Sequence, residues 1–298
     1  MRKFLMSNLG ELWRLLRPRE WVKNGFVFVG LLFANAWHQP QLRLRVLIAA
    51  AAFCLVASGV YIFNDLFDRE QDRNDARKKS RPLAAGRVSA GTAVILLIVL
   101  WILSFGLALL ASRTVLGILL LYIVLNVAYS VRLKDVVLLD VFIIAAGFML
   151  RILAGTVGVG IPPSQWLLLC GLMIALFLGF TKRRAELYAT VNGEPGSQRK
   201  VLGHYQPVLL DKMIVITATC VILTYSLYTM SPVTIQTHHT EALIYTVPFV
   251  MYGIFRYIYS LHTRATGSDP SQEVFRDPHI LFSILGWLVL TLWLLSRH

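Results

Sequence analysis

Charged side chains are scarce in this chain, and their scarcity decides its class. Asp, Glu, Lys and Arg together make up 15% of the 298 residues, whereas 56% of the residues are hydrophobic. Soluble domains usually carry roughly 25% charged residues. We therefore expect an all-α, polytopic membrane protein, and the length leaves no room for a separate soluble domain.

Cysteine is also sparse, and the usual nucleotide and metal motifs are missing. Cys54, Cys170 and Cys220 lie singly in separate apolar segments without metal-ligand spacing, so we interpret them as small core residues. The histidines form no metal-spaced set. The chain has no P-loop, no dinucleotide-binding glycine motif, no Ser-His-Asp pattern and no single-helix zinc motif.

Apolar segments long enough to cross a bilayer recur along the chain and predict about nine transmembrane helices. Their centres lie near Gly30, Leu55, Trp101, Tyr122, Gly147, Gly171, Cys220, Phe249 and Leu288. Residues 4–17 are typical of an interfacial amphipathic helix, and no cleavable signal peptide is evident. We expect a cytoplasmic N-terminal segment over 1–23 and a single transmembrane domain over 24–298.

The distribution of Lys and Arg predicts the orientation of these spans. Nine spans place 23 of the 29 basic residues in five regions on one side and four on the other, while Arg151 and Arg256 lie within or at the edge of spans. Because cytoplasmic loops are enriched in Lys and Arg, we expect a cytoplasmic N-terminus and an external C-terminus in the plasma membrane.

The densest run of charge extends from Asn64 to Pro82, directly after an apolar segment. Its four aspartates have a spacing that places them on one face of a helix: Asp65, Asp68, Asp72 and Asp75. Like charges on one face repel each other without a cation, and Mg²⁺ is commonly held by one or two carboxylates plus substrate phosphates. The basic residues that follow suit phosphate oxygens. The alternative is a solvated helix end in a loop.

Asp140 and Arg151 lie in a later apolar segment and share a helical face. About 16 Å of helix separates them, too far for a direct pair. Because ionisable groups in membranes usually pair or line a cavity, we expect each to have its own partner in a polar cavity, with an ordinary buried ion pair as the alternative.

Other charges border later spans and suit either substrate phosphates or membrane anchoring. They are Arg132 and Lys134, then Lys182, Arg183, Arg184 and Glu186, and finally Arg256 with the loop residues Asp269, Glu273, Arg276 and Asp277. Glu273 and Asp277, four residues apart, suit a second cation or substrate hydroxyls, and a solvated loop is an equally good reading.

The pattern Asn64-Asp65-x-x-Asp68-x-x-x-Asp72 resembles the first aspartate-rich motif of the UbiA-type intramembrane prenyltransferase superfamily. That family has nine transmembrane helices around a central cavity that opens to the cytoplasmic face, where Mg²⁺-bound pyrophosphate lies. The predicted span count and orientation agree with this resemblance over essentially the whole chain.

The second aspartate-rich motif of the family departs from its usual Asp-x-x-x-Asp form. The chain has Tyr129-Ser130-x-Arg132-Leu133-Lys134, then Asp140, Arg151-x-x-Ala154-Gly155, Lys182-Arg183-x-Ala185-Glu186-Leu187 and Arg256-Tyr257. This set is similar to the decaprenyl-phosphate phosphoribosyltransferase branch. The resemblance implies transfer of 5-phosphoribose from phosphoribosyl pyrophosphate to a polyprenyl monophosphate, with release of pyrophosphate, as a step toward arabinofuranosyl donors for cell-surface glycans.

The same resemblance implies roles for individual residues. Asp65, Asp68 and Asp72 would hold Mg²⁺, with Lys134 and Arg151 as further catalytic residues. Substrate would bind Lys23, Asn64, Lys78, Lys79, Arg81, Tyr129, Asp140, Lys182, Arg183, Glu186 and Arg256. The additional cations favour this branch, because its two substrates together bring more phosphate than a prenyl pyrophosphate and a neutral ring.

Two other functions remain open at this point. An aromatic prenyltransferase of the quinone or haem type would keep the fold, the Mg²⁺ and the first motif but use polyprenyl pyrophosphate as donor. A membrane transporter or lipid-binding protein would use the aspartates as a cation-coupled site. The net charge of +13 also suggests nucleic acid, but the cations cluster at membrane boundaries, which argues against it.

Overall fold

The computed structural model describes residues 10–75, 78–191, 200–263 and 276–296. Throughout these residues the regular secondary structure is helical, with no strand, which confirms the all-α prediction. The chain divides into two compact units: unit 1 comprises residues 1–136 and 150–162, and unit 2 comprises residues 137–149 and 163–298. The boundary expected at residue 23 stays a prediction.

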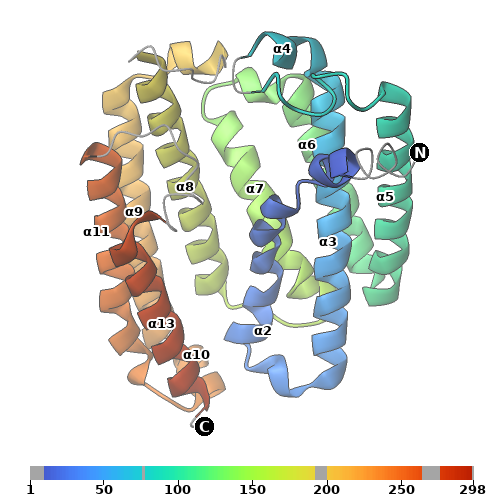
Figure 1. Ribbon diagram of the computed structural model, residues 1–298. Helices are drawn as coiled ribbons and strands as arrows, with labels where there is room; N and C mark the ends of the chain where they lie inside the picture. Colours follow the sequence, from blue (N-terminus) through green and yellow to red (C-terminus); the bar gives the residue numbers. More distant parts are fainter. Residues whose placement is uncertain (1–9, 76–77, 192–199, 264–275, 297–298) are drawn as a thin grey trace. The chain divides into compact units, whose positions relative to one another are not determined.

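Unit 1 is built around three long helices. They are α3 (Pro40–Phe67), α5 (Ala90–Ala111) and α6 (Arg113–Val131). Shorter elements complete it: a helical segment at residues 10–16, η1 (Pro18–Phe28), α2 (Val29–Phe33), η2 (Ala36–His38), α4 (Arg69–Asn74), η3 (Leu133–Asp135) and η4 (Val157–Val159). Helix α3 packs along α5 and also contacts α6 (Figure 1).

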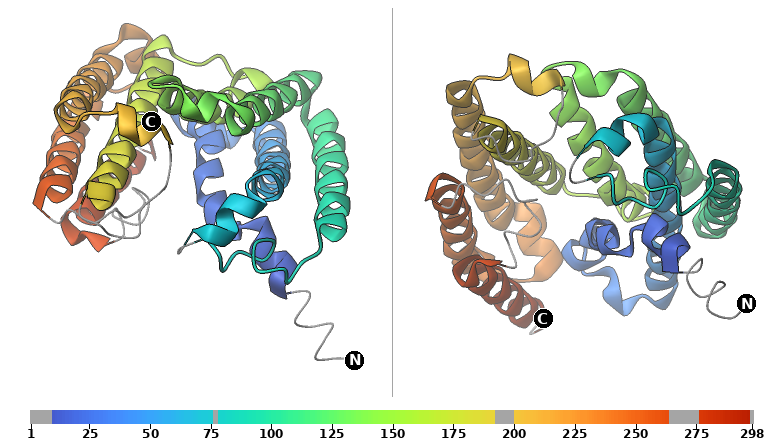
Figure 2. Two further views of the ribbon diagram at one scale, coloured as in Figure 1. Left: turned by 90° about the horizontal axis from the view of Figure 1, so that it is seen from above. Right: turned by 45° about the horizontal axis from the view of Figure 1, so that its top comes forward.

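Unit 2 contains two pairs of packed helices, α8 with α9 and α11 with α13 (Figure 2). Its elements are most of α7 (Leu139–Ala154), then α8 (Gln165–Val191), η5 (Lys200–His204), α9 (Pro207–Met230), α10 (Pro232–His238), η6 (Ala242–Thr246), α11 (Val247–Thr263) and α13 (Pro278–Ser296).

Proline and serine fix where many of these helices begin. Helices α3, α9, α10 and α13 each have proline in the first turn, where its missing N–H costs no helical hydrogen bond. The hydroxyls of Ser89 and Ser112 accept hydrogen bonds from the backbone N–H groups of Thr92 and Val115, which caps α5 and α6.

Eight of the described helices are long and apolar enough to cross a membrane. They coincide with the eight predicted spans from the one centred at Leu55 to the one centred at Leu288. The first predicted span, near Gly30, consists of η1 and α2, two shorter helical pieces that end at Phe33, so the count of nine is approximate. Large apolar side chains exposed on α5, including Ile95 and Ile102, suit contact with lipid.

A close backbone contact packs η1 against the segment that follows α7. A Cβ atom on Gly155 would lie 1.7 Å from the carbonyl oxygen of Val27, whereas a Cβ on Gly117 in α6 would meet nothing within 4 Å. Val27 is fully buried in the unit 1 core beside Phe53 and Ala154. Glycine at position 155 therefore lets η1 lie directly on this core.

We predict that Gly155→Ala destabilises the protein, whereas Gly117→Ala does not. Overpacking a close contact costs about 1–3 kcal/mol or more, so the unfolding temperature of the purified protein should fall for Gly155→Ala. Gly117→Ala should leave it unchanged or raise it slightly, because alanine favours the helix. Tryptophan fluorescence during heating in detergent measures both variants, and equal unfolding temperatures would contradict the packing described.

Candidate active site

The aspartate-rich segment forms an acidic cluster of Asp65, Asp68, Asp72 and Asp75 in unit 1. Helix α3 ends at Phe67 and α4 begins at Arg69, so Asp68 lies at the junction of two helices. The predicted single helical face is thus interrupted. Asp65, Asp72 and Asp75 are buried, with 2%, 1% and 6% of their surface exposed, so each carboxylate needs a nearby positive charge.

Two arginines from distant parts of the sequence neutralise the innermost carboxylates. Arg17 Nη2 lies 2.5 Å from Asp65 Oδ1. Arg81 Nη1 lies 3.0 Å from the same oxygen and 2.6 Å from Asp72 Oδ2. A single nitrogen of Arg81 therefore joins the two carboxylates. The sequence placed Arg81 among the substrate-binding residues but gave no signal for the contact between Arg17 and Asp65.

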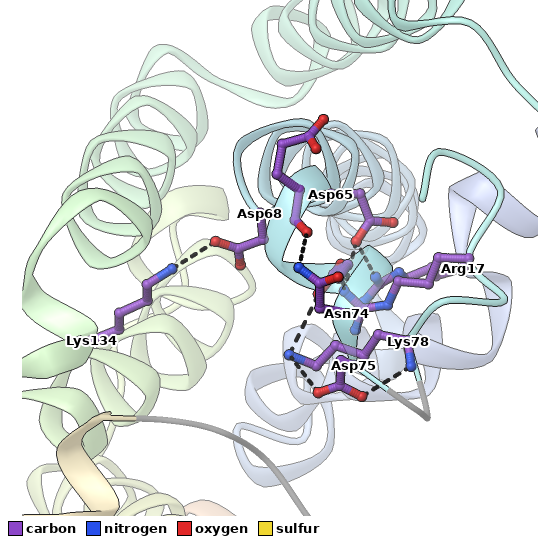
Figure 3. Close-up of polar contacts among 10 residues, drawn as sticks. Arg17, Asp65, Asp68, Asn74, Asp75, Lys78 and Lys134 are labelled. Atoms are coloured by element: carbon purple, nitrogen blue, oxygen red, sulfur yellow. Dashed lines mark hydrogen bonds and ion pairs between the residues drawn. The ribbon is translucent and has the colours of Figure 1, made fainter. Parts of the chain in front are cut away.

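Two lysines contact the outer part of the acidic cluster. Lys78 Nζ lies 3.5 Å from Asp72 Oδ1 and 3.9 Å from Asp75 Oδ2, and Lys134 Nζ lies 2.8 Å from Asp68 Oδ1. Asp68 points toward Lys134, whereas Asp65 faces Arg17 (Figure 3). The predicted catalytic residues Asp68 and Lys134 are thus paired with each other.

The neighbouring amide of Asn64 is also held in place. The single hydroxyl hydrogen of Ser130 is shared between two acceptors, Asn64 Oδ1 and the carbonyl oxygen of Asn126. The last turn of α3 is therefore tied to the last turn of α6, beside Tyr129. Within unit 1, this contact positions the first aspartate-rich motif relative to the segment that carries Arg132 and Lys134.

The pair Asp65 and Asp72 fits a hard divalent cation. Asp72 Oδ1 is buried without a hydrogen-bond partner, and the two side chains already share one cationic nitrogen. Within the described residues, no group of three acidic, histidine or cysteine side chains is arranged to hold a metal. Two carboxylates are sufficient where substrate phosphates complete the Mg²⁺ coordination, and the assignment of Asp65, Asp68 and Asp72 as metal ligands stays a prediction.

Arg151 is buried in unit 1 among polar and aromatic groups. Its Nε donates to Asn24 Oδ1 at 2.8 Å, and its Nη2 donates to the Tyr122 hydroxyl at 3.0 Å. Its guanidinium lies 5.2 Å from the ring centroid of Phe53 and 4.9 Å from that of Tyr122, which stabilises a desolvated cation. No sequence spacing links Arg151 to these partners, which lie up to 127 residues away.

Asp140 and Arg183 form a fully buried ion pair in unit 2. Arg183 Nε lies 2.5 Å from Asp140 Oδ2, and its Nη1 lies 2.5 Å from Glu186 Oε2. The Tyr205 hydroxyl donates to Asp140 Oδ1 at 2.7 Å and accepts from the backbone N–H of Leu138 at 2.8 Å. Burial and the hydrogen bond to Asp140 raise the pKa of Tyr205, which keeps this donor protonated.

Asp140 and Arg151 thus have separate partners, Arg183 for Asp140 and Asn24 with Tyr122 for Arg151. For Asp140 this is the ordinary buried ion pair that was the alternative, and the polar cavity stays a prediction. The carboxylates of Asp140 and Glu186 neutralise Arg183 inside unit 2. Tyr205 was missed because it lies 65 residues beyond Asp140, in a segment without helical periodicity relative to it. The substrate-binding roles of Asp140, Arg183 and Glu186 stay predictions.

The remaining predicted residues lie in varied surroundings. Lys23 Nζ lies 2.5 Å from Glu20 Oε2, Lys79 is exposed, and Tyr129 and Lys182 are half-buried. Arg256 Nε lies 3.0 Å from Asp277 Oδ2. Asp269 and Glu273 lie outside the described residues, so the suggestion that Glu273 and Asp277 bind a second cation or substrate hydroxyls stays a prediction.

Asp277 is held ionised by its surroundings. Burial opposes ionisation, but hydrogen bonds from the backbone N–H groups of His279 and Ile280 and from Arg256 lower the pKa of Asp277 below its ordinary value. The carboxylate therefore caps the start of α13 and anchors Arg256 at neutral pH.

A model of the UbiA prenyltransferase family matches residues 25–276. The chain belongs to this family. A UbiA homolog from Archaeoglobus fulgidus, solved bound to GPP and Mg²⁺, superposes on it with a TM-score of 0.71 at 18% identity, covering 96% of this chain and 99% of the homolog. The fold of this UbiA-family chain is therefore that of the solved homolog.

Two curated relatives resemble this UbiA-family chain over most of its length. Decaprenyl-phosphate phosphoribosyltransferase of Corynebacterium glutamicum is 34% identical over 287 residues, which cover 92% of this chain and 83% of the relative. The protein of the same name from Mycolicibacterium smegmatis is 31% identical over 295 residues, covering 92% and 89%. The predicted resemblance to the family and to this branch is confirmed.

We predict that Asp140→Asn strongly destabilises this UbiA-family protein. Removing one partner of a buried ion pair costs about 3–5 kcal/mol, and Glu186, which stays beside Arg183, places the expected loss toward the lower end of this range. The matched control is Asp211→Asn: Asp211 pairs with Arg184 at 2.8 Å but its side chain is 34% exposed, so its loss should cost about 0–1 kcal/mol. Thermal unfolding in detergent compares them, and similar losses would show that the buried pair does not hold unit 2.

Proposed function

We propose that this UbiA-family protein transfers 5-phosphoribose from phosphoribosyl pyrophosphate to a polyprenyl monophosphate of the decaprenyl type. The observation that carries the proposal is the acidic cluster, in which two buried carboxylates share Arg81 and further cations surround them. Such a site suits a metal together with several phosphate groups. The relatives named decaprenyl-phosphate phosphoribosyltransferase support the same substrates.

The reaction exchanges one bond at C1 of the ribose. The bond between C1 and the pyrophosphate oxygen breaks, the pyrophosphate leaves with the electron pair, and an oxygen of the acceptor phosphate bonds to C1. The acceptor is already anionic, so the protein has to position it rather than remove a proton. A Mg²⁺ ion, which Asp65 and Asp72 would hold, would supply positive charge for the leaving pyrophosphate.

The residues of the acidic cluster have separate tasks in this reaction. Asp65 and Asp72 would hold the metal through oxygens that now contact Arg81 and Lys78. Arg81 and Lys78 would then bind pyrophosphate oxygens, because guanidinium and ammonium groups form strong hydrogen bonds to phosphate. Lys134, paired with Asp68, would contact a second phosphate.

The location of the reaction follows from the distribution of basic residues. We place the acidic cluster and the N-terminus on the cytoplasmic side of the plasma membrane, where phosphoribosyl pyrophosphate is available and where basic loops gather. The isoprenoid tail would lie among the apolar spans. The lipid product would be a step toward arabinofuranosyl donors for cell-surface glycans.

The other two functions differ in what they require of the acidic cluster. An aromatic prenyltransferase would use the same metal site with polyprenyl pyrophosphate and a hydroxybenzoate. A transporter or lipid-binding protein would use the carboxylates without turnover. The cations around the cluster favour the phosphoribosyl donor over a prenyl donor, because its 5-phosphate adds negative charge that the site can bind.

We predict that purified protein in liposomes transfers label from phosphoribosyl pyrophosphate to polyprenyl phosphate, and that this requires Mg²⁺. Asp65→Asn and Asp72→Asn should lower turnover about 100-fold or more, since a catalytic metal contributes several kcal/mol. Glu70→Gln is the matched control: Glu70 lies on α4 with its side chain 80% exposed and pairs with Arg73, so turnover should stay near that of the wild type.

Mass spectrometry of the lipid fraction identifies the product. Formation of a phosphoribosyl lipid supports the proposal. Prenylation of a hydroxybenzoate from polyprenyl pyrophosphate, with no label from phosphoribosyl pyrophosphate, would establish the aromatic alternative instead. Unchanged product yield in Asp65→Asn and Asp72→Asn would refute the assignment of these two residues as metal ligands.

A further inference from the structure

Arg81 differs from the other cations of the acidic cluster in the position that it occupies. Its Nη1 lies between two buried carboxylates, 3.0 Å from Asp65 Oδ1 and 2.6 Å from Asp72 Oδ2. Each carboxylate also has another cation at its side, Arg17 for Asp65 and Lys78 for Asp72. Arg81 therefore fills the point where the two carboxylates converge, which is where an ion shared by both would lie.

The burial of these groups decides which of them can move. The side chains of Asp65 and Asp72 are 2% and 1% exposed, whereas that of Arg81 is 30% exposed. Arg81 belongs to the segment between α4 and α5, and its long side chain reaches inward from the rim of the cluster. The guanidinium can thus withdraw without unfolding α3 or α4, while the carboxylates stay in place.

Electrostatics favour a cation at this point. Two carboxylates buried close together repel each other and are costly without a compensating charge. A divalent ion and the Arg81 guanidinium cannot both occupy the space between Asp65 and Asp72. A guanidinium released there would lie beside the metal, where it can bind a phosphate group through two parallel hydrogen bonds.

We propose that Arg81 is an internal substitute for the metal ion: it neutralises Asp65 and Asp72 in the metal-free protein and transfers to the substrate pyrophosphate when the metal binds. This exchange couples the two ligands. Binding of the metal breaks the contacts of Arg81 with Asp65 and Asp72. The displaced side chain then increases the affinity of the site for pyrophosphate. The inference rests on the proposed function only in requiring a pyrophosphate-bearing donor.

We predict that Arg81→Gln changes the two affinities in opposite directions. Without its competitor, Mn²⁺ alone should bind about fivefold more tightly or better, which is a typical coupling between sites. Inorganic pyrophosphate, measured at saturating Mn²⁺, should bind about tenfold more weakly or worse, because a charged hydrogen-bond partner is lost. Electron paramagnetic resonance of free Mn²⁺ and isothermal titration calorimetry measure these two quantities on the full chain.

Two variants control this experiment. Arg14→Gln removes one positive charge from the helical segment at residues 10–16, where Arg14, with its side chain 68% exposed, pairs with Glu11, and should change both affinities by less than about twofold, because exposed charges interact weakly. Arg81→Lys keeps a competing charge but loses the two parallel hydrogen bonds of a guanidinium, so its Mn²⁺ affinity should stay near that of the wild type while its pyrophosphate affinity falls. If Arg81→Gln does not fold, this separation of the two affinities in Arg81→Lys is the test, and a fall in both would overturn the inference. The unfolding temperature of metal-free Arg81→Gln should fall and recover with Mn²⁺.

The outcomes are distinct. A merely structural role for Arg81 would weaken Mn²⁺ and pyrophosphate together, and an unchanged Mn²⁺ affinity in Arg81→Gln would mean that Arg81 does not compete with the metal. Either result overturns the inference. Opposite shifts without any phosphoribosyl lipid product would leave the role of Arg81 intact and refute the proposed substrate, because inorganic pyrophosphate reports on either kind of donor.

Discussion

The burial of negative charge at the end of α3 is the constraint on which unit 1 depends. Asp65 and Asp72 are almost fully excluded from solvent, so the chain has to bring cations to them. It does so from two directions: Arg17 precedes η1, and Arg81 follows α4. Arg17 adopts a left-handed backbone conformation with φ of 52°, which is rare for residues with a side chain. The turn at Arg17 is therefore held by its surroundings, and the Asp65 contact is one of them.

A second buried charge, the guanidinium of Arg151, holds η1, the element that follows Arg17. Asn24 on η1 accepts a hydrogen bond from Arg151, and Gly155 lets the backbone of Val27 approach. Because η1 begins directly after Arg17, these contacts hold in place the helix that adjoins the arginine paired with Asp65. Arg151 is thus linked to the acidic cluster through η1 and Arg17. A direct catalytic role for Arg151 stays a prediction.

The sequence was sufficient for the helical class, for eight spans and for the closeness of the aspartates along one segment. These follow from local properties, namely length, hydropathy and spacing. It could not give the partners of the charges, because Arg17 and Asp65, Arg151 and Asn24, and Tyr205 and Asp140 are brought together by tertiary packing. The sequence also predicted one continuous helical face through Asp68, whereas α3 ends at Phe67 and α4 begins at Arg69.

The excess of basic residues serves folding as well as binding. Lys and Arg exceed Asp and Glu by 13, and Arg81 and Arg183 each neutralise two acidic groups at once. In the acidic cluster four carboxylates lie beside four cations, namely Arg17, Lys78, Arg81 and Lys134, so the charges there balance. These cations surround carboxylates that suit a metal. A phosphate-rich substrate can then satisfy the cations while the metal satisfies the carboxylates, so that binding replaces internal ion pairs rather than creating charge in a membrane protein.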